Sequence, residues 1–119
     1  MFANVKIGER EIPMKAMASV DYLYWQVFHE DPIQLQTRDN FGAGEQINFT
    51  MKMGFIMAML AAGDRKSVSS MNEESYLDWL DQFERIDYLN AVGDIRLVYE
   101  GQFASGADAK KKDAEPTAS

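Results

Sequence analysis

Residues 51–60 read Met51-Lys52-Met53-Gly54-Phe55-Ile56-Met57-Ala58-Met59-Leu60 and hold four of the eight methionines of the chain but only one charged residue. A helix on the surface of a globular protein keeps an apolar stripe on one face and polar residues on the other. In this stretch Met51, Phe55 and Met59 recur at four-residue spacing, and other apolar side chains fill the adjoining arc. The pattern therefore predicts a helix that is covered on nearly every side.

Two interpretations of this methionine-rich helix remain open at the level of sequence. Methionine is unbranched and polarizable, so it fills irregular gaps in a core, and it also recurs on surfaces that bind variable partners. The first interpretation makes the helix part of the hydrophobic core. The second, which we adopt as the working hypothesis, makes it a partner-binding or oligomer surface. That surface would consist of Met51, Met53, Phe55, Met57 and Met59.

The composition predicts one domain over residues 1–103. A chain of 119 residues that is 46% hydrophobic can bury a core without metal or disulfide support. Residues 104–119 contain no bulky apolar side chain, so we expect a disordered tail. The absence of cysteine excludes a disulfide framework and a cysteine nucleophile. No apolar run is long enough to span a membrane, and the N-terminal residues lack the basic-then-apolar order of a secretory signal, so we expect a cytoplasmic protein.

The net charge of −7 is concentrated in one region. Residues 72–101 carry eight carboxylates and only two guanidinium groups, a net charge of −6. Such a surface repels phosphate backbones, so nucleic acid is not an expected partner. The acidic run is either a solvated helix face that aids solubility or a docking surface for a basic partner.

The sequence predicts a mainly α fold of the α+β class, in which a small N-terminal β-hairpin precedes four to five helices. Alternation predicts the hairpin over residues 2–14, with its turn at Gly8 and Glu9. Apolar periodicity and breakers then place the helices over 19–30, 32–39, 45–62, 73–83 and 87–101, with a polar loop over 63–70.

Capping residues and one apolar face refine these helices. Ser19 is a candidate N-cap of the first helix, and either Ser70 paired with Glu73 or Asn72 is expected to begin the fourth. The fourth helix turns its apolar positions to one side. We assign Trp79, Leu80 and Phe83 to the core.

No combination of residues suggests catalysis. The only histidine lies in the run from His29 to Asp31, whose neighbouring side chains point in different directions on a helix and cannot converge on a metal. Asp78 and Asp81 lie on the predicted solvent side of their helix instead of in a cleft that would separate their pKa values. The Gly42-Ala43-Gly44 run lacks the remainder of a phosphate-binding loop. We expect no enzyme, no metal site and no cofactor.

Four segments carry a resemblance to a known family. They are the hairpin end Ile12-Pro13-Met14-Lys15-Ala16, the run from Tyr24 to Asp31 (YWQVFHED), the run from Phe55 to Met59 (FIMAM) and the run from Asn72 to Phe83 (NEESYLDWLDQF). In this order they resemble the tail assembly chaperones of long-tailed, siphovirus-type phages and prophages of Gram-positive bacteria. The resemblance spans roughly residues 5–101, and its most specific part is the segment from Glu73 to Phe83.

The resemblance implies a function but no catalytic residue. Members of that family are small non-virion proteins of the host bacterial cytoplasm that bind the tape measure protein, keep it soluble and help to recruit tail tube protein subunits. It also implies a homo-oligomer and a longer, frameshifted form of the chain. A slippery codon run could lie at Lys110-Lys111-Lys112.

Two rival functions are compatible with the same residues. The first is a structural virion component, such as a connector or minor tail protein. The second is a small acidic regulatory module that binds a basic protein through residues 72–101.

Overall fold

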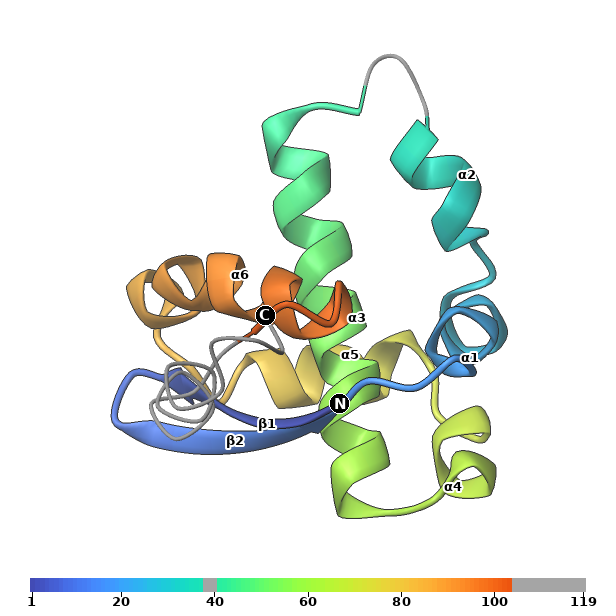
Figure 1. Ribbon diagram of the computed structural model, residues 1–119, viewed down its shortest axis with the longest axis horizontal. Coiled ribbons are helices and arrows are strands. Elements are labelled where there is room, and N and C mark those ends of the chain that lie inside the picture. Colours follow the sequence, from blue (N-terminus) through green and yellow to red (C-terminus); the bar gives the residue numbers. More distant parts are fainter. Residues whose placement is uncertain (38–40, 104–119) are drawn as a thin grey trace, which may run out of the picture.

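Figure 1 shows the computed structural model of the protein, which describes residues 1–37 and 41–103. A two-stranded antiparallel hairpin precedes six helices in this part of the chain. The elements are β1 (Phe2–Ile7), β2 (Arg10–Lys15), α1 (Val20–Phe28), α2 (Pro32–Thr37), α3 (Ala43–Ala62), α4 (Arg65–Ser69), α5 (Glu73–Leu80) and α6 (Arg85–Tyr99).

The hairpin forms because its sequence alternates and its turn contains glycine. Gly8 has φ 64°, the positive value that a type II′ turn requires at its first central position. The register pairs Val5 with Ile12 and Ala3 with Met14, and all four side chains are buried on one face. The opposite face is exposed. A single covered face holds this register, since a slip of one residue would turn the apolar side chains to solvent.

Helix α3 is the centre of the molecule. It runs through the middle of Figure 1, with the hairpin and α6 on one side and α1 and α4 on the other. Strand β2 and helices α1, α4, α5 and α6 all contact α3, while β1 contacts α6. Helices α3 and α6 approach each other at Gly54, where an added Cβ would lie 2.9 Å from Cγ2 of Ile95 in α6. The absence of a side chain at Gly54 thus lets the two helices pack closely.

Local sequence sets the ends of the helices. Asn72 accepts a hydrogen bond from Ser75 N at 3.1 Å while Ser75 Oγ accepts one from Asn72 N at 3.3 Å, which makes a reciprocal capping box at the start of α5. Helix α6 ends in a Schellman motif, in which Gly101 has φ 73° and donates to Val98 O, and the next amide donates to Leu97 O. Of the two predicted starts of α5, the structure therefore selects Asn72.

The predicted fold class is confirmed: the described chain is mostly helical, with an N-terminal hairpin. Three local predictions need correction. Ser19 stands at the N-cap of α1, but its hydroxyl is buried and has no hydrogen-bond partner among the described residues. The predicted loop 63–70 contains α4, which is capped by Asp64 through Ser67 N at 2.8 Å. Helix α6 begins at Arg85, two residues before the predicted cap Asp87. The predicted tail, residues 104–119, lies outside the described residues.

Candidate partner-binding surface

The structure corrects the predicted methionine surface at four of its five positions. Met51, Met53, Phe55 and Met57 are at most 1% exposed within a single protomer, and only Met59 is partly exposed. The cause is the central place of α3, which elements contact on several sides. Of the two interpretations left open by the sequence, core packing describes these four side chains in the folded protomer.

The predicted core residues of α5 and the turn after it are placed unevenly. Trp79 is buried at 6% exposure and packs against Phe55 with ring centroids 5.7 Å apart. Leu80 and Phe83 are only half-buried, although both pack against the core. Phe83 also lies under the guanidinium of Arg10, 5.0 Å from the ring centroid, which joins the hairpin to the end of α5. Trp79 is thus a core residue, whereas Leu80 and Phe83 line the edge of the core.

One charged network at the edge of the core joins α3 to the segment that follows α1. Lys52 Nζ lies 3.3 Å from Glu30 Oε1, which also accepts a hydrogen bond from Tyr24 OH at 3.2 Å. The ammonium lies 5.0 Å from the centroid of the Phe28 ring. Burial raises the pKa of Tyr24, and the charge of Glu30 adds to this effect, so the hydroxyl keeps its proton and donates to the carboxylate. The network thus pairs the single charged residue of the methionine-rich stretch, residues 51–60.

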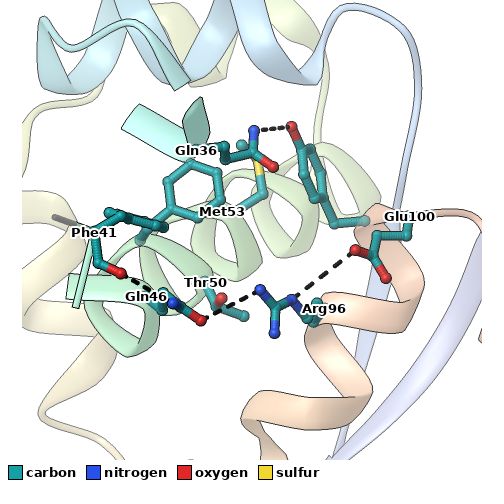
Figure 2. A pocket seen from close by; sticks show the side chains of 9 residues that line it. Gln36, Phe41, Gln46, Thr50, Met53, Arg96 and Glu100 are labelled. Atoms are coloured by element: carbon teal, nitrogen blue, oxygen red, sulfur yellow. Dashed lines mark hydrogen bonds and ion pairs between the residues drawn. The ribbon is translucent and has the colours of Figure 1, made fainter. Parts of the chain in front are cut away.

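Figure 2 shows an enclosed pocket between α2, α3 and α6. Polar side chains close it: Gln36 donates to Tyr99 OH at 3.2 Å, and Arg96 donates to Gln46 Oε1 at 3.4 Å. Thr50 and Met53 form part of its wall. The cavity volume is about 20 Å³, enough for a single water molecule. The pocket is therefore too small for an organic ligand.

A wider groove lies between α3, α5 and α6. Its volume is about 260 Å³, and its wall contains two residues that the sequence had singled out, Met51 and Leu80. The apolar part of the wall is completed by Ile47, Tyr76, Tyr88 and Leu89. We call this the α3/α5/α6 groove. Met51, although itself buried, here adjoins apolar side chains that are only half-buried.

A second accessible apolar feature lies on α1. Tyr22 is 58% exposed and Trp25 is 50% exposed, and their ring centroids are 6.0 Å apart. Gln26 donates a hydrogen bond to Tyr22 OH at 3.2 Å. Aromatic side chains of this kind are enriched in protein interfaces. Neither residue belongs to a site predicted from the sequence. The helical periodicity nevertheless indicates that both rings lie away from the buried positions of α1.

Among the residues considered for chemistry, Glu30 and Asp31 line an open pocket beside α2, and Gly44 lines the α3/α5/α6 groove. Asp78 and Asp81 are exposed on α5 and at its end, and His29 is exposed at the end of α1 with φ 58°. Within residues 1–37 and 41–103, no group of three or more His, Asp and Glu residues is placed to hold a metal ion. In the same ranges no helix has the length and apolar character needed to cross a bilayer.

Three tyrosines show raised pKa values, and each has burial as the leading cause. Desolvation raises the pKa of Tyr76, with further contributions from the neighbouring Tyr88 and Glu73. Desolvation and a hydrogen bond to Asp21 at 2.7 Å raise the pKa of Tyr99 to about 12. A raised pKa keeps these phenols protonated at neutral pH, so they act as hydrogen-bonding groups and not as bases.

Comparisons of the chain with protein-family models, with curated proteins and with solved structures found no match. The resemblance described above therefore stays a sequence-based prediction.

Proposed function

We propose that this protein is a non-catalytic tail assembly chaperone that binds apolar helices of a tape measure protein. It would keep them soluble in the bacterial cytoplasm and help to recruit tail tube subunits around them. The proposal combines the sequence resemblance with one structural observation: accessible apolar residues interrupt an otherwise acidic helical surface at the α3/α5/α6 groove.

The physical argument concerns the substrate. A long helix that exposes apolar side chains aggregates unless another surface covers them. A helical domain with an apolar groove can cover such side chains without requiring one particular sequence. The carboxylates that α5 and α6 expose then keep the complex charged and soluble.

Co-expression tests this function. A helical fragment of the tape measure protein encoded beside the gene should remain in the supernatant with the chaperone and sediment without it. The two proteins should copurify, and their complex should survive molar salt because apolar burial is hardly screened. An insoluble fragment in the presence of excess folded protein would contradict the proposal. Reading the gene for an adenine-rich slippery run at Lys110–Lys112 separately tests the frameshifted form.

One structural observation favours a second candidate, the regulatory module that binds a basic partner. Helices α5 and α6 expose most of their carboxylates, among them Glu73, Glu74, Asp78 and Asp94. A complex held by these charges would dissociate as salt screens them, which distinguishes it from the chaperone complex. Detection of the protein in purified virions would instead favour a structural virion component.

A further inference from the structure

The α3/α5/α6 groove has the features of a docking site for a single helix. Six apolar or aromatic residues line it: Ile47, Met51, Tyr76, Leu80, Tyr88 and Leu89. Four of these, Ile47, Leu80, Tyr88 and Leu89, are only half-buried and so retain area that a partner can cover. A groove between helices receives side chains at helical spacing, the usual mode by which an amphipathic helix binds.

Tyr76 adds an independent observation. It is 3% exposed and lines the groove, yet its hydroxyl makes no hydrogen bond to any residue that the structure describes. Its ring is held in place by Phe28 and Phe55, at centroid distances of 5.5 and 5.7 Å. Among the described residues only Ser19 Oγ is a buried side-chain polar atom without a partner, so the Tyr76 hydroxyl reaches solvent at the groove. An incoming polar group can therefore bond to this fixed hydroxyl.

The charges around the groove limit which occupant fits. Glu73 lies near enough to Tyr76 for its charge to raise the pKa of that phenol. Glu73 stands beside the groove, three residues before Tyr76 on α5, and Arg85 is the charged residue in its wall. The α5–α6 region as a whole carries a net charge of −6. A second copy of the chain would bring the same carboxylates against this region, so repulsion disfavours it. Residues 104–119 carry Lys110–Lys112 but no large apolar side chain to fill the groove.

We propose that the α3/α5/α6 groove binds one amphipathic helix of a partner protein, with apolar side chains in the groove and lysine or arginine beside Glu73. This inference deepens the proposed function, on which it rests for the kind of partner. It names the face of the domain that binds and the charge of the bound segment. The exposed Tyr22–Trp25 pair is the rival surface, but the Tyr22 hydroxyl already accepts a hydrogen bond from Gln26.

The test uses the full chain and two labelled peptides of about 20 residues, long enough to form a helix. One peptide carries leucines at three- and four-residue spacing with flanking lysines, and the other carries glutamates in place of the lysines. In the wild-type protein, binding of the lysine peptide should shift the methyl NMR signals of Ile47, Met51 and Leu89. The glutamate peptide should bind at least about tenfold more weakly at low salt.

Two matched pairs of variants separate apolar from charged contacts. Leu89→Ser should weaken binding of the lysine peptide by about tenfold or more, because an apolar anchor loses its contact, whereas Leu97→Ser on the same helix should change it by less than about twofold. Glu73→Gln should weaken binding about two- to threefold at low salt and not in molar salt, whereas Asp94→Asn should leave it unchanged. The wild-type NMR footprint decides the question even if a variant fails to fold.

Three outcomes would overturn the inference. They are a footprint on Tyr22 and Trp25, equal binding of the two peptides, and conversion of an oligomer to a monomer by Leu89→Ser, which would assign the groove to a second copy. The outcomes are separable from those of the proposed function. Solubilisation of the tape measure fragment that is unaffected by Leu89→Ser would reject the groove alone, and peptide binding at the groove without such solubilisation would reject the function alone.

Discussion

Helix α3 and the α5–α6 pair differ in nearly every physical respect. Ten of the twenty residues of α3 are buried, whereas only Ala91, Ile95 and Val98 are buried among the fifteen residues of α6. The apolar residues of α3 are mostly buried against other elements of the chain, whereas most residues of α5 and α6 are exposed or only partly buried. Where the two regions meet, half-buried apolar residues line the α3/α5/α6 groove. In this chain three of the four methionines of residues 51–60 belong to the core.

The strongest test of this contrast is a truncation in each region. Phe55→Ala should lower the free energy of unfolding by about 3–5 kcal/mol, because Phe55 is 1% exposed and its ring packs against those of Phe28, Tyr76 and Trp79. Ile86→Ala on α6 should change it by less than about 0.5 kcal/mol, since Ile86 is 63% exposed. Urea denaturation followed by circular dichroism measures both. Equal costs at the two positions would remove the distinction between core and surface helices.

The two mid-helix glycines provide the next test, because the same substitution should have opposite signs. Gly54→Ala places a methyl group 2.9 Å from the branched side chain of Ile95, and overpacking of about 1–3 kcal/mol should exceed the gain in helix propensity. Gly93→Ala on α6 meets no atom within 4 Å and should stabilise the protein by about 0.5–1 kcal/mol. Thermal unfolding of both variants would show it. A stabilised Gly54→Ala protein would mean that α3 and α6 do not pack as closely as described.

A smaller effect is expected at the cap of α5. Asn72→Ala removes the acceptor of the capping box and should cost about 1 kcal/mol. Ser70→Ala, at the alternative cap suggested by the sequence, should cost less than about half of that, because Ser70 lies outside α5 and its hydroxyl donates only to Ser67 O. Chemical denaturation of the two variants ranks them. The reverse order would place the start of α5 at Ser70.

The smallest effect concerns the titration of a phenol and appears only at alkaline pH. Tyr99 joins α6 to Asp21 of α1, and its pKa is raised to about 12, above the ordinary value near 10 of the unfolded chain. The folded state therefore holds the phenolic proton more tightly, so this contribution is complete below pH 10 and is lost between about pH 10 and 12. Stability measured from pH 8 upward should fall less steeply in Tyr99→Phe than in the wild type. Tyr24 and Tyr76 keep part of the slope in the variant, and identical slopes would exclude Tyr99 as a contributor.

Much of the fold follows from local chemistry in the sequence. Alternation and a Gly-Glu turn are sufficient to place the hairpin, and helical periodicity with breakers is sufficient for α1, α3 and α5. Helix α4 is not predicted from the sequence, because five residues are too few to show a helical period. Its one buried side chain, Val68, lies among serines. The packing of Gly54 against Ile95 joins residues 41 positions apart, so no local pattern reveals it.

The candidate site was less accessible to prediction. Apolar residues around the whole circumference of α3 indicate that the helix is covered, but they do not say whether this chain or another one covers it. The answer depends on how many elements of the same chain reach the helix, which is a property of the tertiary fold. Met51 and Leu80 line one groove only because the tertiary fold brings α3, α5 and α6 together, and no local sequence pattern shows this.

The ion pair between Lys52 and Glu30 bears on how many side-chain packings α3 can adopt. A helix that is apolar on most sides can rotate about its own axis into alternative packings of similar burial, but the ammonium reaches Glu30 in only one of them. We expect this ion pair to select a single side-chain arrangement more than to add net stability. Lys52→Met should then retain the helical circular dichroism signal while its methyl resonances broaden and near-ultraviolet ellipticity declines. Sharp, fully dispersed spectra from that variant would show that steric fit alone sets the rotation.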